Sequence, residues 1–279
     1  MIFIFKDNNK EFFLKMKPAK KMFFFDIDGT LLSSKYKQIF SQTTEAIKKL
    51  AKQPEVILGI ATGRNIKRID VLGDLLPYFK HLILFNGGLT KVFDKIIDDR
   101  PFKKEVVQEL ITKAHEAKIY IGLTGFDQEI IPSEKDLIPT SLQKLYFTNK
   151  NSLVDPEFHL HNNVYQVWLF EPNRQKLDNF LKDFPYLQKY YWGSAAGADL
   201  VPANVNKVTG IKLIKDLYKD YQLICVGDGH NDVDMLKYAD IGIGMSNTSC
   251  QEVKDNADLL APSVDNNKFY DFLKENNLI

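Results

Sequence analysis

Short runs of apolar residues alternate with amphipathic segments along most of the chain. Residues 22–25 contain no polar residue, as expected for a strand that is buried on both faces of a sheet. Similar apolar runs lie at residues 56–61, 81–85, 223–226, 241–245 and 257–261. Between them, residues 43–52 and 207–218 place apolar side chains at helical spacing. This alternation predicts an α/β fold with a Rossmann-like parallel sheet flanked by helices.

The pattern changes near residue 89, where strand-like runs and helical stretches no longer alternate regularly. The strand-like runs are residues 91–97, 119–123, 128–131 and 164–170. Amphipathic helices are predicted at residues 103–118 and 173–184. We interpret residues 89–189 as an inserted α+β cap domain. The core domain would then comprise residues 21–88 and 190–279, and residues 1–20 would form an N-terminal appendage.

The composition excludes several classes of protein. The chain has 279 residues, of which 44% are hydrophobic and 26% charged, as is typical of globular proteins. Lysine and arginine total 37 against 36 acidic residues, so no basic surplus indicates a nucleic-acid partner. No apolar run approaches the roughly 18 residues that span a bilayer, so no membrane association is expected. Two cysteines, Cys225 and Cys250, are too few for a disulfide framework or a zinc site, and a cytoplasmic setting is expected.

Three of the predicted core strands end in polar, glycine-containing segments, at residues 26–30, 62–64 and 227–232. Each segment alone could be an ordinary turn, because glycine, aspartate, asparagine and threonine are common turn formers. In an open parallel sheet, however, the carboxyl ends of the strands meet where ligands bind. Three such ends with this content of acids therefore favour a functional site.

These residue types suit phosphoryl transfer. A carboxylate that attacks phosphorus needs a cation to offset the charge of the ester. Magnesium prefers oxygen ligands, which Asp26 and Asp228 could supply from adjacent strand ends. Asp28 would face the same side as Asp26 in an extended chain and could act as general acid and base. Thr62 and Lys207 would add a hydroxyl and a cation for the transferring group.

The segment DIDGTLL at residues 26–32 resembles the first motif of the haloacid dehalogenase superfamily of phosphatases. TGR at 62–64 is similar to the second motif, Lys207 to the third, and GDGHND at 227–232 to the fourth. The resemblance covers the chain from Met22 to its end. The insertion between the second and third motifs, with NGG at 86–88 and MSN at 245–247, resembles the Cof-type branch. Members of that branch hydrolyse phosphorylated sugars and cofactors.

The resemblance implies a role for each matching residue. Asp26 would be the nucleophile and Asp28 the general acid/base. Magnesium would be bound by Asp26, the backbone carbonyl of Asp28, and Asp228. Phosphate would be bound by the Ile27 backbone, Thr62, Gly63, Lys207 and Asn231, with Asp232 orienting the metal ligands from behind. Val208 follows Lys207 where the family often has glycine, which leaves Lys212 as an alternative for the third motif.

Other chemically capable residues favour a structural interpretation. His159 and His161 are close in sequence, but no third metal ligand is apparent near them. His230 occupies a variable position of the fourth motif, so solvent exposure is expected. Tyr165 and Trp168 alternate with apolar neighbours and are expected in the cap core rather than as a substrate platform.

Three functions other than that of a phosphatase are possible for such a sequence. A phosphomutase of the same superfamily usually carries a smaller helical cap after the first motif, whereas the first two motifs here are close together. A receiver-like phospho-acceptor lacks an acid at the position of Asp28. A ligand-binding protein without catalysis would not need every catalytic acid. The partner is expected to be a small phosphorylated metabolite, such as a sugar phosphate, pyridoxal phosphate or flavin mononucleotide; the oligomeric state stays open.

Overall fold

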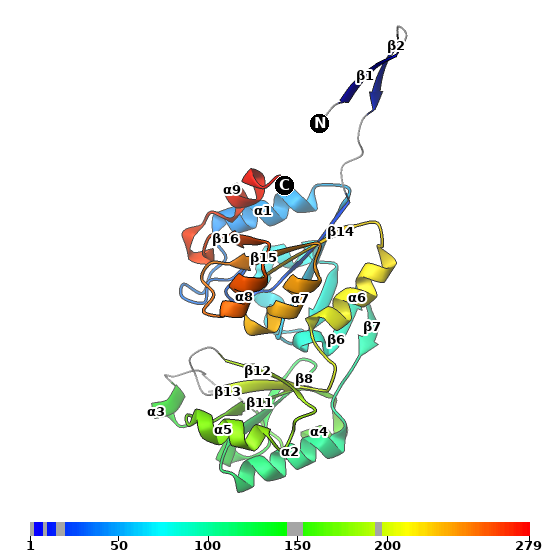
Figure 1. The fold of residues 1–279 in the computed structure, drawn as a ribbon. Coiled ribbons are helices and arrows are strands. Elements are labelled where there is room, and N and C mark those ends of the chain that lie inside the picture. Colours follow the sequence, from blue (N-terminus) through cyan, green and yellow to red (C-terminus); the bar gives the residue numbers. More distant parts are fainter. Residues whose placement is uncertain (1–2, 8–9, 15–19, 144–152, 193–196) are drawn as a thin grey trace.

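The computed structural model describes residues 3–7, 10–14, 20–143, 153–192 and 197–279 of the chain. Its larger sheet is the expected Rossmann-like core and has eight strands among these residues (Figure 1). In spatial order the strands are β16 (Leu259–Ala261), β15 (Ile241–Met245), β14 (Gln222–Gly227), β3 (Lys21–Phe25), β4 (Val56–Ala61), β5 (His81–Leu84), β6 (Leu89–Val92) and β7 (Lys95–Asp99). The strands from β16 to β5 pair in parallel. The predicted α/β class is therefore confirmed.

Helices cover both faces of the core sheet. They are α1 (Ser41–Ala51) and α9 (Phe269–Glu275) on one face, and α6 (Lys207–Leu217), α7 (Val233–Tyr238) and α8 (Gln251–Asn256) on the other. Phe23 and Phe25 of β3 pack in the apolar cluster with α1 and α9. Met22 and Phe24 point the other way and pack in the cluster with α6, α7 and α8. All four side chains are fully buried, which explains why residues 22–25 include no polar residue.

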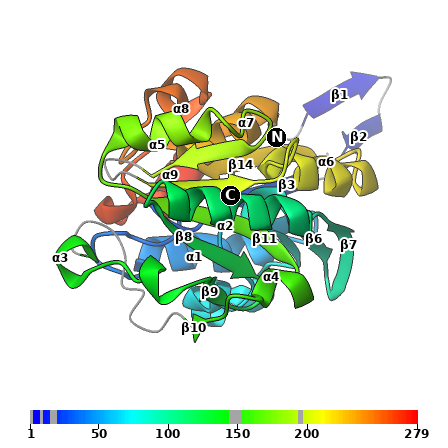
Figure 2. The same cartoon turned by 90° about the horizontal axis from the view of Figure 1, so that it is seen from below.

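A second sheet of six strands forms the cap. In spatial order its strands are β10 (Leu153–Val154), β9 (Glu129–Ile131), β8 (Tyr120–Gly125), β11 (Val164–Phe170), β13 (Gly197–Val201) and β12 (Gln188–Tyr191). Its helices are α2 (Lys104–Glu116), α3 (Thr140–Gln143), α4 (Phe158–His161) and α5 (Arg174–Leu181). The larger two, α2 and α5, lie on the side of this sheet away from the core (Figures 1 and 2). The opposite face of the cap sheet is therefore turned toward the core domain.

The chain passes from the core sheet to the cap sheet, and back again, at positions that differ from the expected cap boundaries at residues 89 and 189. β6 and β7 follow residue 88 but pair with β5 and so extend the core sheet. The expected single strand at residues 91–97 is a hairpin, because the chain reverses at Phe93, whose φ is 52°. At the other end, β13 pairs with β11 and β12 and belongs to the cap sheet. By strand membership, the cap begins after β7 and ends with β13.

The N-terminal strands β1 (Phe3–Asp7) and β2 (Lys10–Leu14) pair with each other in an antiparallel hairpin. This hairpin joins neither of the larger sheets and stands apart from the core in Figure 1. None of the helices among the described residues combines the length and hydropathy of a membrane-spanning segment.

Candidate active site

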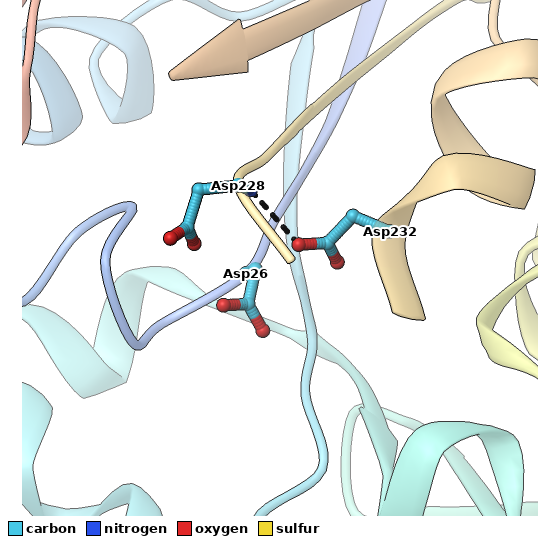
Figure 3. A group of neighbouring side chains, drawn as sticks. All are labelled: Asp26, Asp228 and Asp232. Carbon is cyan, nitrogen blue, oxygen red and sulfur yellow. Dashed lines mark hydrogen bonds between the residues drawn. The ribbon is translucent and has the colours of Figure 1, made fainter. Parts of the chain in front are cut away.

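Three aspartates lie together at the carboxyl ends of two neighbouring core strands. β3 and β14 pair in parallel with Phe25 opposite Val226, so Asp26 and Asp228 emerge at the same edge of the sheet. Asp232 follows in the 3₁₀ turn His230–Asp232. Each of the three offers a carboxylate oxygen within 4.8 Å of the others (Figure 3). The structure thus brings together acids from the first and fourth sequence motifs.

Asp232 supports the loop that carries Asp228. Its Oδ2 accepts hydrogen bonds from the backbone N–H groups of Asp228 at 2.9 Å and Gly229 at 2.8 Å. Its Oδ1 accepts a hydrogen bond from Lys207 at 2.6 Å. Because both of its oxygens are used within the protein, Asp232 lies close to the other acids but is poorly placed to bind a ligand directly. The supporting role that the resemblance implies for Asp232 stays a prediction.

Lys207 lies between two of the acids. Its Nζ donates to Asp26 Oδ1 at 2.7 Å and to Asp232 Oδ1 at 2.6 Å, and its side chain is fully buried. Burial disfavours its positive charge, but the two carboxylates outweigh that effect and raise the pKa of Lys207. The alternative, Lys212, instead places its Nζ 5.2 Å from the centre of the Tyr238 ring. Val208 packs in the core, so its replacement of the usual glycine does not displace Lys207.

Burial and mutual repulsion disfavour negative charge on the clustered acids. Burial raises the pKa of Asp26 to about 7; the charge of Asp232 adds to this effect and that of Lys207 opposes it. Burial, followed by the charges of Asp26 and Asp232, raises the pKa of Asp228 well above its usual value. Among the described residues, Lys207 is the single cation bonded to these three acids. The cluster therefore has a charge imbalance that a bound cation would reduce.

The donor set fits a magnesium ion. Oδ2 of Asp26 accepts no hydrogen bond from the part of the chain that the structure describes. The Asp228 carboxylate is held by Thr30 Oγ1 at 3.0 Å and more loosely by Asn247 Nδ2 at 3.3 Å. Two carboxylates and a nearby backbone carbonyl are oxygen ligands of the kind that magnesium prefers. Asp26 and Asp228 are thus the side chains best placed to hold a metal.

Asp28 lies beside this cluster but turns toward an arginine. Its carboxylate forms a two-pronged ion pair with Arg64, with distances of 2.7 Å from Nε and 2.6 Å from Nη2. Burial alone would raise the pKa of Asp28, but the hydrogen bonds and charge of Arg64 outweigh it and hold the pKa below its usual value. The side chain is 50% exposed, so substrate can reach it. This pairing with Arg64 was not predicted from the sequence.

Residues 62 and 63 of the second motif are closely packed. Thr62 is buried, and its Oγ1 accepts the backbone N–H of Arg64 at 3.2 Å. A Cβ atom at Gly63 would lie only 3.0 Å from Nδ2 of Asn86, so a larger residue would crowd that side chain. Ile27, between the two first-motif acids, is fully buried, which leaves its backbone as the part able to contact a ligand.

Asn86 is a site residue for which sequence reasoning gave no role. It follows β5 with a φ of 54°, a left-handed conformation that asparagine tolerates better than most residues. Its Oδ1 accepts a hydrogen bond from Asn231 Nδ2 at 2.8 Å. Its Nδ2 donates to Gln166 Oε1, on cap strand β11, at 3.1 Å. Asn86 therefore connects the fourth motif to the cap; the only sequence signal was the NGG segment that begins with it.

The residues expected to be structural occupy structural positions. His159 is buried and bonds through Nε2 to Gln108 at 2.9 Å, and the three aspartates are the one potential metal-binding group among the described residues. His230 is 47% exposed, as expected. Tyr165 and Trp168 are both buried, and Tyr165 stacks on Phe85 with ring centres 4.5 Å apart.

Comparison with known proteins identifies the family. Residues 23–273 match the model of the haloacid dehalogenase-like hydrolase family. The chain is 27% identical over 271 residues to a Streptococcus pyogenes protein provisionally named a bifunctional phosphatase/peptidyl-prolyl cis-trans isomerase. That match covers 95% of this chain but 56% of the relative, so the chain spans little more than half of the relative's length. A Bacillus subtilis protein provisionally named as a phosphatase is 25% identical over 93% of this chain and 98% of its own length.

A solved structure agrees with this result. A HAD subclass IIB sugar phosphatase superposes with a TM-score of 0.78 at 25% identity, over 93% of this chain and 100% of that one. The expected superfamily and enzyme class are thereby confirmed. This chain belongs to the haloacid dehalogenase-like hydrolase family.

Proposed function

We propose that this enzyme is a magnesium-dependent phosphatase of a small phosphorylated metabolite, a sugar phosphate or phosphorylated cofactor, and that it acts through a phospho-aspartate intermediate. The observation that carries the proposal is the contact of buried Lys207 with Asp26, beside Asp228 at the ends of adjacent strands. Such an arrangement orients the carboxylate of Asp26, and its two oxygens could then be divided between attack on phosphorus and contact with the metal. The named activity of the sugar phosphatase with a similar fold supports the same reaction class.

The first chemical step would transfer the phosphoryl group to Asp26. A carboxylate oxygen of Asp26 attacks phosphorus, and the bond from phosphorus to the leaving oxygen breaks as the new bond forms. Lys207, Thr62 and Asn231 would hold the non-bridging oxygens. A magnesium ion held by Asp26, Asp228 and the Asp28 carbonyl would supply positive charge that offsets repulsion between the nucleophile and the ester.

Asp28 would move the protons in both steps. It would donate a proton to the leaving oxygen in the first step, and its carboxylate would take a proton from water as that water attacks phosphorus in the second. The second attack breaks the bond from phosphorus to Asp26 and restores the free carboxylate. The ion pair with Arg64 stabilises the charged, base form of Asp28. A phosphate dianion bound nearby would oppose that stabilisation and favour the protonated, acid form.

A screen for phosphate release tests the proposed function. The purified chain with magnesium would be assayed against sugar phosphates, pyridoxal phosphate and flavin mononucleotide. We expect at least one of them to be hydrolysed with a kcat/KM of about 10⁴ M⁻¹s⁻¹ or more. Phosphate release from none of the panel, and none from p-nitrophenyl phosphate, would contradict the proposal.

The acid role of Asp28 predicts a dependence on the leaving group. Asp28→Asn should lower kcat/KM for an alkyl phosphate by about 10²-fold or more, because an alkoxide leaves poorly without a proton. The loss for p-nitrophenyl phosphate should be much smaller, since nitrophenolate needs little protonation to leave. Steady-state kinetics over both substrates would show the difference. Equal losses would mean that Asp28 organises the site without transferring a proton.

A further inference from the structure

The face of the cap sheet that is turned toward the core carries an acidic residue, Asp199. It lies on β13, directly opposite Trp168 on β11 and Tyr190 on β12. Directly opposed residues of antiparallel strands share one face of a sheet. The flanking residues Ala198 and Leu200 point the other way, into the cluster covered by α2 and α5. Asp199 therefore lies on the face without these helices.

Contacts between the domains place this face beside the active site. β12 contacts the turn His230–Asp232, which carries Asn231 and Asp232 of the fourth motif. The Tyr190 hydroxyl, on the same face as Asp199, donates to the Val205 carbonyl at 3.5 Å, just before Lys207 in the chain. On β9, Glu129 forms an ion pair with Arg68, close to the second motif. The core-facing side of the cap sheet thus lies next to the second and fourth motifs, so a leaving group bound at the active site would face it.

A chain of side-chain amides leads from the proposed phosphate site to Asp199. Asn231 donates to Asn86 at 2.8 Å, and Asn86 donates to Gln166 at 3.1 Å. Gln166 and Trp192 in turn lie beside Asp199, and their side-chain donors favour its charged form. Three intervening side chains therefore separate the carboxyl of Asp199 from any phosphate oxygen bound by Asn231. A leaving group that carries its amine several bonds from phosphorus, as an amino sugar does, is the kind that could reach across these side chains.

The partners of Asp199 differ from those of two other acids, Asp28 and Glu129. Asp28 has Arg64, and Glu129 has Arg68. Within the described residues, no ion pair joins Asp199 to a lysine or arginine, and its neighbours Gln166 and Trp192 are neutral. Burial raises the pKa of Asp199 to about 7; the charge of Glu129 adds to this effect and the charge of Arg68 opposes it. A carboxylate in this environment is stabilised by a cation more than by a neutral donor.

We propose that Asp199 is a specificity residue that binds an ammonium group on the leaving group, so that the preferred substrates are phosphate esters of amino alcohols or amino sugars. The inference rests on the proposed phosphatase function. An ammonium group would provide both a hydrogen-bond donor and the positive charge that the neutral partners of Asp199 lack. A hydroxyl group would provide only the hydrogen bond. The enzyme should therefore discriminate between two substrates that differ only in carrying an amine or a hydroxyl group at the same position.

Matched substrate pairs test this inference. One pair is O-phosphoethanolamine and 2-hydroxyethyl phosphate; the other is glucosamine 6-phosphate and glucose 6-phosphate. For the wild-type protein we expect kcat/KM to favour the amine by about 10-fold or more in at least one pair, because the amine adds a charge to the hydrogen bond that the hydroxyl can also form. In Asp199→Asn this ratio should fall to near one, whereas hydrolysis of p-nitrophenyl phosphate, which has neither group, should be little changed. Asp183→Asn, an exposed cap acid, is the matched control.

The possible outcomes separate the inference from the proposed function. If wild-type protein hydrolyses p-nitrophenyl phosphate but shows no amine preference in either pair, the assignment of Asp199 is wrong and the phosphatase proposal stands. An amine preference that is unchanged in a correctly folded Asp199→Asn variant would also contradict the assignment of Asp199. Calorimetry can measure the affinity of each substrate pair for the Asp26→Asn variant and for the Asp26→Asn/Asp199→Asn double variant. This measurement needs no turnover. Equal affinities for amine and hydroxyl there would also contradict the inference; should Asp199→Asn fail to fold, the wild-type ratio still decides.

Discussion

Replacement of Asp26 by asparagine is expected to lower kcat by about 10⁴-fold or more while leaving the fold intact. The substitution keeps the size of the side chain but removes the nucleophilic charge. It also removes one of the two carboxylates placed to hold a metal. Burial already disfavours the charged form of Asp26, so loss of that charge should not unfold the protein. Phosphate-release assays would measure kcat, and circular dichroism would show whether the fold is intact.

Asp216→Asn provides a matched control for this experiment. Asp216 is an exposed acid on α6, the same helix that begins with Lys207, and its neutralisation should leave kcat within about twofold, as expected for surface substitutions. An Asp26→Asn protein that keeps more than about a tenth of the wild-type rate would rule out Asp26 as the nucleophile, because covalent catalysis depends on its carboxylate.

Removal of divalent metal is expected to have an effect of similar size. Excess chelator should lower activity by about 10²-fold or more, and magnesium should restore it, because one lysine does not balance three clustered acids. Calcium should restore little activity, since its larger and looser coordination would shift the attacking and leaving oxygens. Dialysis followed by titration with each metal would measure the effect. Full activity in chelator would contradict the assigned metal site.

Because the pKa values of Asp26 and Asp228 are raised, the metal requirement should depend on pH. Asp26, with a pKa of about 7, and Asp228, with a pKa raised well above its usual value, hold protons in the metal-free protein at lower pH. Protons therefore compete with magnesium as pH falls through about 7. We expect the magnesium concentration for half-maximal activity to be higher at pH 6 than at pH 8.

Much of the core could be predicted because its signals are local. The apolar runs of β4, β11 and β15 gave strand bounds identical to those observed, since strands buried by helices or by the cap core tolerate few polar residues. The polar segments at strand ends also converge as expected, because parallel pairing of β3 and β14 forces Asp26 and Asp228 to one edge.

What the sequence did not reveal depends on contacts between distant segments. The partner of Asp28 is Arg64, 36 residues away. Residues 62–64 were expected at the same edge of the sheet, but the sequence does not indicate which side chain Asp28 would bond. The link from Asn86 to Gln166 crosses from core to cap and exists only once both domains are folded. β12 mixes polar and aromatic residues without a clear period, so the return of the chain to the core was expected too early.

The most direct test of the account is a search for the phosphoryl group on Asp26 itself. Enzyme and substrate would be mixed with magnesium, quenched in acid during turnover, and digested for peptide mass spectrometry. The account predicts a peptide containing Asp26 that has gained the mass of one phosphoryl group and loses it on treatment with hydroxylamine, as an acyl phosphate does. Wild-type protein that turns over substrate but carries this modification on no peptide, or on a residue other than Asp26, would contradict the proposed mechanism.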